Sequence, residues 1–375
     1  MKSLVVALSL ITLFSCKNRE TKTETPMTET PIKEEQTTPF YIGTYTDGDS
    51  KGIYKLALNQ DGTFTEPVLA AETSNPSFIT FNSDKTILIA VNENDPGTVE
   101  SFKVKSDSLV SINKRETGGA SPCFVTINDQ NYILVANYSG GNVSLLKLNE
   151  DGSLSELLDL EQHTGKGTTD RQEGPHAHSA WFIPDGSGII SADLGTNQLW
   201  FSAINTETNK LEPANVQKLN LPVGAGPRHL VFHPTANFIY VLNELDNTIA
   251  QISSENGNYT IKGITSILPE GFSDYSKAAD IHISRDGMFI YASNRGNDSI
   301  AILKVAEDGS LQLLANEPTK GKDPRSFKLT PDEKFIIVAN QNGNNLVSYK
   351  RNSETGLMTF ISEVNAPAPV SILFE

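Results

Sequence analysis

Residues 174–200, GPHAHSAWFIPDGSGIISADLGTNQLW, predict three short strands in succession. The first strand ends at a turn of Pro184, Asp185 and Gly186, and the second ends at a polar tip that begins with Asp193. Proline, aspartate and glycine between runs of apolar residues are typical of such turns. Similar openings occur at 226–234 and at 323–332, so the stretch is one copy of an internal repeat. A repeat of this kind determines the fold and has to be recognised first.

Six copies of the opening strand can be aligned along the chain. They begin at equivalent positions spaced 46, 55, 50, 51 and 46 residues apart, namely Ser77, Cys123, His178, Arg228, Ala279 and Arg325. Each opening is followed by a second strand with a polar tip, then by a third and a fourth strand. Four short strands in a unit of about 40–50 residues are typical of a β-propeller blade.

The two ends of the chain supply the strands of a seventh unit. Residues 369–374 read as a first strand, 40–46 as a second strand with its tip, and 52–58 and 64–70 as the third and fourth. Pairing the first and last strands of the chain closes a ring without leaving an edge. We therefore expect an all-β fold, a seven-bladed β-propeller with four-stranded blades and almost no helix. The alternative is a six-bladed propeller with frayed ends.

The N-terminal residues predict export. Residues 1–16 contain Lys2, an apolar run and then Cys16, which fits a lipoprotein signal peptide with Cys16 as the lipidated residue. A plain signal peptide is the alternative. Residues 17–39, rich in Thr, Glu, Lys and Pro, are expected to form a disordered tether, and residues 40–375 the propeller. These features predict a lipid-anchored protein of the cell envelope, on its periplasmic or surface side. Only Cys123 then remains, so no intramolecular disulfide can form.

The charge of the chain limits the classes of partner. A formal net charge of −15 argues against nucleic acid and against anionic lipid, so the lipid anchor is the only membrane contact expected. The sequence contains no zinc-type spacing, phosphate loop or serine nucleophile elbow. We expect a monomer that binds a small molecule without a cofactor. The alternative, a divalent ion held in the channel by Asp193, Glu244 or Asp280, stays open.

The aligned register places two rings of side chains at one mouth of the central channel, because the start of each first strand and the end of each second strand lie on the same face. The inner ring is Ser77, Cys123, His178, Arg228, Ala279, Arg325 and Val370. The tip ring is Tyr45, Glu93, Tyr138, Leu194, Glu244, Arg295 and Gln341.

Five members of these rings stand out: His178, Arg228, Arg325, Glu244 and Arg295. Arginines gathered at one site favour a carboxylate or phosphate ligand, and a histidine beside them can move a proton near neutral pH. The alternative is that these side chains only tie adjacent blades together.

The remaining histidines are expected to have lesser roles. His176 and His229 neighbour the inner ring but point the other way if strand alternation holds, and they are packing or substrate-binding candidates. His233 and His282 fall at the turn end of their strands and are expected to be structural, whereas His163 is expected to lie in solvent.

The motifs Gly-Pro-His-x-His at 174–178, Gly-Pro-Arg-His at 226–229, Asn-Glu at 243–244 and Ser-Asn-Arg at 293–295 resemble the seven-bladed lactonase family. This family includes propeller-type 6-phosphogluconolactonases and fungal carboxy-muconate lactonising enzymes. The resemblance covers the chain from about Phe40 onward. Carried over motif by motif, it implies a catalytic set of His178, Arg228, Glu244 and Arg295. Arg325 comes from the aligned register alone, and it is a substrate-binding candidate together with His176, His229 and Asp193.

The activity that the resemblance implies is hydrolysis of a sugar-derived or anionic lactone, as in a 6-phosphogluconolactonase. On this hypothesis Arg228 and Arg295 hold the anionic group and the developing oxyanion, and His178 activates water or protonates the leaving oxygen. Glu244 orients His178 or an arginine, or itself acts as acid or base. A non-catalytic binding propeller of the envelope and a muconate-type cycloisomerase are the alternatives.

Overall fold

The computed structural model describes residues 4, 12–13, 37–255 and 257–375, and Gln36–Glu375 form one compact unit. Cys16 and nearly all of the predicted signal peptide and tether lie outside the described residues. Among the residues that are described, no helix is long and apolar enough to cross a membrane.

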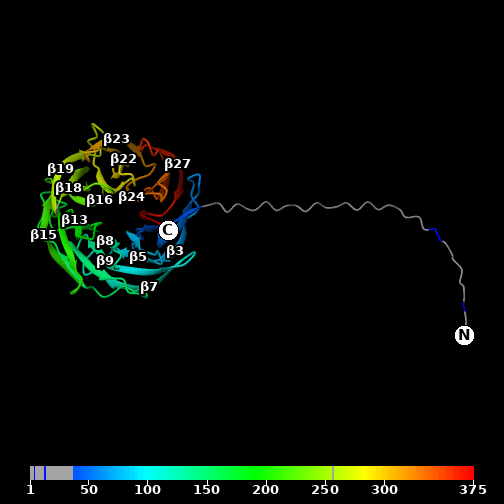
Figure 1. The fold of residues 1–375 in the computed structure, drawn as a ribbon. Coiled ribbons are helices and arrows are strands. Elements are labelled where there is room, and N and C mark those ends of the chain that lie inside the picture. Colours follow the sequence, from blue (N-terminus) through cyan, green and yellow to red (C-terminus); the bar gives the residue numbers. More distant parts are fainter. Residues whose placement is uncertain (1–3, 5–11, 14–36, 256) are drawn as a thin grey trace. The chain divides into compact units, whose positions relative to one another are not determined.

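The described chain folds into seven antiparallel sheets of four strands each, and Figure 1 shows them following one another around a ring. The first three complete blades are β4 (Ile79–Phe81), β5 (Ile87–Asn92), β6 (Thr98–Val104) and β7 (Leu109–Glu116); β8 (Pro122–Ile127), β9 (Tyr132–Asn137), β10 (Asn142–Lys147) and β11 (Asp159–Gln162); and β12 (Ala177–Phe182), β13 (Ile189–Asp193), β14 (Gln198–Asn205) and β15 (Lys210–Asn220). The next three are β16 (Pro227–Phe232), β17 (Phe238–Asn243), β18 (Thr248–Glu255) and β19 (Asn258–Ser266); β20 (Lys277–Ile283), β21 (Phe289–Arg295), β22 (Ser299–Val305) and β23 (Leu311–Pro318); and β24 (Pro324–Leu329), β25 (Phe335–Asn340), β26 (Asn345–Arg351) and β27 (Met358–Asn365).

The seventh blade joins the two ends of the chain. Its strand order is β28 (Pro369–Phe374), β1 (Thr38–Thr44), β2 (Gly52–Leu58) and β3 (Val68–Glu72). The predicted closure is therefore confirmed, and Figure 1 shows the C-terminus beside the blue N-terminal strands. Two predicted boundaries need correction. The strand predicted at 40–46 is β1, and it starts at Thr38 because Thr38 and Pro39 already pair with β2. The strand predicted at 64–70 is β3, which starts only at Val68, since Phe64 forms just an isolated bridge with Leu58.

The blades are held together by apolar side chains between neighbouring sheets. Tyr240 and Leu242 of β17, for example, pack with Ile281, Ile290 and Ala292 of the next blade, and all five are fully or almost fully buried. Burial of apolar surface stabilises a fold by roughly 25 cal/mol per Å². Because each blade contacts two others in this way, the ring fixes the relative positions of residues far apart in sequence.

A buried amide closes the second strand of five blades. A fully buried asparagine is the last residue of the strand in four of them and the next-to-last in β21, namely Asn92, Asn137, Asn243, Asn340 and, in β21, Asn294. In each of the five the side-chain amide donates a hydrogen bond to a neighbouring loop or strand, as from Asn294 to the carbonyl of Ile267 at 3.0 Å. In the blade of β13 the equivalent residue is Asp193, which is also fully buried.

Candidate active site

Inner-strand bulges determine where the candidate side chains lie. In the blade of β12, Ala177 pairs with Asp193 and Ser179 pairs with Ala192, so His178 is an extra residue without a partner. The same one-residue shift occurs in four other inner strands, at Cys123, Arg228, Arg325 and Val370. A β-bulge re-aims the extra residue and is common beside active sites.

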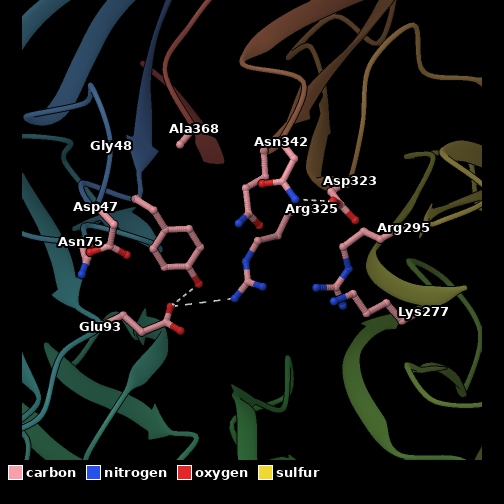
Figure 2. Close-up of a pocket in the computed structure, with 12 residues that line it drawn as sticks. Asp47, Gly48, Asn75, Glu93, Lys277, Arg295, Asp323, Arg325, Asn342 and Ala368 are labelled. Atoms are coloured by element: carbon pink, nitrogen blue, oxygen red, sulfur yellow. Dashed lines mark hydrogen bonds and ion pairs between the residues drawn. The ribbon is translucent and has the colours of Figure 1, made fainter.

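The bulged residues and the strand tips surround a cavity of about 320 Å³ at one mouth of the channel. We call it the inner cavity; it is lined by Tyr45, Glu93, Cys123, Tyr138, Arg171, His178, Glu244, Lys277, Arg295 and Arg325. A second cavity of about 540 Å³, the outer cavity, shares five of these residues and adds Asp47, Gly48, Asn75, Asp323, Gln341, Asn342 and Ala368 (Figure 2). The predicted tip ring therefore does line this mouth, except for Leu194, which is fully buried in the wall.

Glu244 lies at the centre of the charged groups. Its Oε2 accepts hydrogen bonds from Nε of Arg228 at 3.0 Å and from Nη2 of Arg295 at 2.8 Å, and its Oε1 accepts one from Arg171 at 3.2 Å. Burial alone would raise the pKa of Glu244, but the charges of Arg295, Arg228 and Arg171 lower it to about 2. The lowered pKa favours an ionised Glu244 that holds the arginines over one that acts as an acid or base, and its role in a reaction stays a prediction.

Arg228 lies behind the inner cavity instead of lining it. The side chain is 2% exposed, and besides Glu244 it donates to the carbonyl oxygen of Ala279. Burial and the neighbouring Arg295 lower the pKa of Arg228 to about 10, so it stays charged at neutral pH. Its donors are directed at the protein, so its observed role is to hold Glu244.

His178 presents an imidazole at the base of the inner cavity. Its Nδ1 lies 3.6 Å from Sγ of Cys123, and its Nε2 lies 3.9 Å from Oε2 of Glu244, which is beyond hydrogen-bond distance. Burial and the positive charge of Arg228 hold the pKa of His178 well below its usual range. The imidazole is therefore neutral at physiological pH and can accept a proton.

Arg171 and Lys277 belong to the inner cavity but were not identified from the sequence. Arg171 comes from the loop 163–176 between β11 and β12, and its Nη2 donates to the hydroxyl of Tyr138 at 2.8 Å as well as to Glu244. Lys277 is the first residue of β20 and pairs with Arg295. The repeat alignment covers strands and tips, so it gave no signal for Arg171, which lies in a loop. It also missed Lys277, because this residue lies two positions before the aligned residue of its strand, Ala279.

Asp193 fixes both ends of the loop that carries Arg171. Its Oδ2 lies 2.6 Å from Nδ1 of His163, and its Oδ1 accepts the backbone N–H of His176 at 2.9 Å. The ring of His163 also stacks on Trp200 at 4.0 Å and is 1% exposed. Two expectations are corrected here. His163 is buried because it bonds to Asp193, and Asp193 anchors a loop at the buried-asparagine position and does not reach the cavity.

The other two substrate-binding candidates also lie outside the cavity. His176 stacks on the ring of Tyr138 at 4.5 Å, and its Nδ1 bonds to the Tyr138 carbonyl oxygen. His229 lies below the mouth in the channel, 3.1 Å from Asp280, and its ring contacts aromatic rings of other blades, among them Phe124. Neither side chain lines the inner or the outer cavity, so the contacts observed for both are packing contacts, and substrate binding by them stays a prediction. His229 faces the channel with Arg228 because the bulge interrupts the alternation on which its predicted orientation depended.

Other polar groups around the channel are engaged with each other. Asp280, which was considered as a metal ligand, contacts His229, His282 and Ser326. His282 therefore has a structural partner, as expected, and His233 accepts backbone N–H groups of its own turn. Within residues 37–255 and 257–375, no group of three or more His, Cys, Asp or Glu side chains is arranged to hold a metal ion.

The comparison with known proteins decides the family. Residues 39–374 match the family model described as lactonase, 7-bladed beta-propeller. The chain belongs to this seven-bladed lactonase family. Among its relatives is a 6-phosphogluconolactonase of Bacillus subtilis, 37% identical over 89% of this chain and 97% of the relative. Among the solved structures is a periplasmic gluconolactonase of Pseudomonas aeruginosa, with a TM-score of 0.87 and 30% identity over 90% of this chain and 99% of that one.

Another lactonase-family relative, named 6-phosphogluconolactonase, comes from Formosa agariphila and is 31% identical over 84% of this chain and 93% of the relative. The chain thus spans nearly the full length of these lactonases. Their names differ in the substrate, since one is a gluconolactonase and two are 6-phosphogluconolactonases. Family membership therefore establishes the lactonase-type propeller and leaves the site and the substrate of this chain to be argued from its own cavity.

Proposed function

We propose that this protein hydrolyses a sugar-derived or anionic lactone, of the 6-phosphogluconolactone type, in the inner cavity. The observation that supports this most directly is a neutral imidazole, His178, in a cavity whose walls carry four cationic side chains, Arg171, Lys277, Arg295 and Arg325, against the two carboxylates of Glu93 and Glu244. Such a cavity combines a proton acceptor with an excess of positive charge in a protein whose formal net charge is −15.

The proposed reaction begins with attack of water on the lactone carbonyl. His178 removes a proton from the water as its oxygen bonds to the carbonyl carbon, and the carbonyl oxygen becomes an oxyanion. Guanidinium groups of Arg171 and Arg295 stabilise that oxyanion. The ring carbon–oxygen bond then breaks, and the leaving oxygen takes the proton back from His178. The product is the open hydroxy acid, and the histidine is restored to its neutral form.

The surroundings of His178 fit this role. Burial raises the pKa of the Cys123 thiol, so the sulfur stays protonated and can donate to the carbonyl oxygen of His178 at 3.5 Å. The sulfur lone pairs are then free to accept a hydrogen bond from Nδ1–H of His178, which leaves Nε2 of His178 as the basic nitrogen. Once Nε2 is protonated, the anionic Glu244 at 3.9 Å stabilises the imidazolium.

A panel of lactones tests the proposal. Purified protein should open D-gluconolactone or its 6-phosphate faster than the spontaneous reaction, measured by acid release at constant pH in matched buffers with and without chelator. Absence of turnover on every lactone would favour a binding propeller. Formation of a lactone from a carboxy-muconate would instead identify a cycloisomerase.

We also propose a location in the cell envelope through a lipid on Cys16. The apolar run that ends at this cysteine supports the proposal. In cells grown with a labelled fatty acid, the wild-type protein should carry label and sediment with membranes, whereas Cys16→Ala should do neither. An unlabelled soluble wild-type protein would contradict the proposal.

A further inference from the structure

The inner and outer cavities meet at a boundary formed by the five residues that line both of them. These are Tyr45, Glu93, Lys277, Arg295 and Arg325, so the boundary carries three cations and one carboxylate. Figure 2 shows the side chains of Arg325, Arg295 and Lys277 directed into the same space, with Glu93 on the far side of Arg325. The other carboxylates of the outer cavity, Asp47 and Asp323, line that cavity alone.

The cations at this mouth differ in how far their charge is already compensated. Glu244 accepts hydrogen bonds from both Arg228 and Arg295, and Arg295 also donates to the carbonyl oxygen of Ala278. In addition, Nε of Arg295 is buried without an acceptor in the described part of the chain. Arg228 and Arg295 are therefore largely occupied by one carboxylate.

Arg325 and Lys277 are the uncommitted cations. Arg325 lies over the ring of Tyr45, 5.2 Å from its centroid, and its one ion-pair contact within the described residues is with Glu93 at 3.9 Å. That distance is too long for a hydrogen bond, so the guanidinium donors have no acceptor among residues 37–255 and 257–375. The side-chain ammonium of Lys277 forms neither a hydrogen bond nor an ion pair with any described residue, although the residue is half-buried.

We propose that Lys277 and Arg325 form an anion subsite that holds the negatively charged group of the substrate, a phosphate monoester or a carboxylate, while the lactone ring lies in the inner cavity beside His178. This inference rests on the proposed lactonase function and names the substrate class. It moves the anion-holding role from Arg228 and Arg295, where the sequence placed it, to the two cations whose side chains donate no hydrogen bond to a described residue.

Binding of an anion at this subsite would also act on His178. Arg325 is one of the positive charges that lower the pKa of His178, after burial, Arg228 and His229. A phosphate or carboxylate beside Arg325 offsets that charge and makes the imidazole a stronger base. An anionic substrate would thus strengthen the base in the cavity that it occupies, whereas a neutral lactone would not.

Three lactones that differ at carbon 6 test the subsite: D-gluconolactone, its 6-phosphate, and glucarolactone, which carry a hydroxymethyl group, a phosphate and a carboxylate. For the wild-type protein we expect kcat/KM to be highest with one of the two anionic lactones. Arg325→Gln and Lys277→Gln should each raise KM for that lactone by about 10- to 100-fold, the range for hydrogen bonds to charged groups. Both variants should lose less with gluconolactone than with the preferred anionic lactone, since the neutral substrate brings no charge to the subsite.

Lys322→Gln is the matched control, because Lys322 is an exposed lysine in the loop before Arg325 and lines neither cavity. It should leave all three KM values within about twofold of wild type, because screened surface charges contribute little. Arg325→Lys keeps the charge and should recover part of the loss, which a folding defect would not. Equal losses on all three lactones in both glutamine variants, or a wild-type preference for the neutral lactone, would overturn the subsite.

Calorimetric binding of 6-phosphogluconate and glucarate separates this inference from the proposed function. If no lactone is hydrolysed but wild type binds either acid and Lys277→Gln binds it at least tenfold more weakly, the function fails and the anion subsite stands. If gluconolactone is hydrolysed while neither acid binds, the function stands and the subsite fails. The two acids also show whether phosphate or carboxylate is the preferred anion.

Discussion

Nε2 of His178 and Oε2 of Glu244 lie 3.9 Å apart, and no hydrogen bond joins them. The carboxylate is instead bonded to Arg171, Arg228 and Arg295. Glu244 therefore positions arginines and faces His178 only as a nearby negative charge. This arrangement separates the two functions that the sequence could not separate, which are proton transfer and compensation of buried positive charge.

Replacing His178 by Asn should abolish most turnover without unfolding the protein. Loss of a positioned general base typically lowers kcat by about 10²- to 10⁴-fold. The melting temperature, measured by circular dichroism, should stay close to wild type. His233→Asn is the control, because His233 accepts backbone N–H groups of a surface turn. Activity in His178→Asn within threefold of wild type would rule out His178 as the base.

The pH dependence of the reaction should report the depressed pKa of His178. A base must be neutral, and the neutral fraction falls as pH drops below its pKa. Because burial and Arg228 hold the pKa of His178 well below 6.5, kcat/KM should be level from pH 7.5 down through 6.5 and decline only in more acidic buffer. Initial rates from pH 5 to 7.5, corrected for spontaneous hydrolysis, measure this. An acid limb centred at or above pH 6.5 would contradict the assignment.

Glu244→Gln should strongly destabilise the propeller. It removes the carboxylate that compensates buried Arg228 and Arg295, and breaking such a buried charge cluster typically costs about 3–5 kcal/mol. Denaturant unfolding at pH 7 gives the change directly. The exposed residue Glu307 provides the comparison, since Glu307→Gln should alter the unfolding free energy by less than about 0.5 kcal/mol. Equal stability of the two variants would show that Glu244 is not needed to hold the arginines.

Asp193→Ala should release the loop 163–176. The carboxylate bonds to His163 at one end of this loop and to the backbone of His176 at the other, so its removal frees Arg171 from a fixed position. Hydrogen exchange of the loop amides should become faster, and kcat/KM should fall by about tenfold or more, because small displacements of a site residue reduce rates strongly.

Asp193→Asn distinguishes the contact of Asp193 with His163 from its contact with the backbone of His176. An amide oxygen can still accept the backbone N–H of His176, whereas the bond to His163 changes from carboxylate to amide. We expect an intermediate exchange rate and an intermediate kcat/KM. Unchanged exchange in Asp193→Ala would show that other contacts, such as those of buried Gln172 with Leu194 and Asn197, hold the loop by themselves.

The sequence predicted the architecture because a propeller repeats its local signals. Turns, apolar runs and polar tips recur once per blade, so six aligned openings and two complementary ends were enough to predict seven blades and the closing pair β28 and β1. The same register identified the mouth at which His178, Glu244, Arg295 and Arg325 meet. These features depend on strand order and spacing, which are written along the chain.

Only the tertiary structure decided how the charges at that mouth are shared. Strand alternation misplaced His229 because one bulged residue shifts every side chain that follows it. Asp193, a substrate-binding candidate, occupies the position of a buried asparagine, which the sequence did not reveal. Arg171 comes from a loop that the repeat alignment did not cover. Lys277 is a candidate for binding an anion because Arg228 and Arg295 are already bonded to Glu244. Which cation is left for a ligand depends on distances between residues of different blades, and a repeat pattern, being local, contains no such distances.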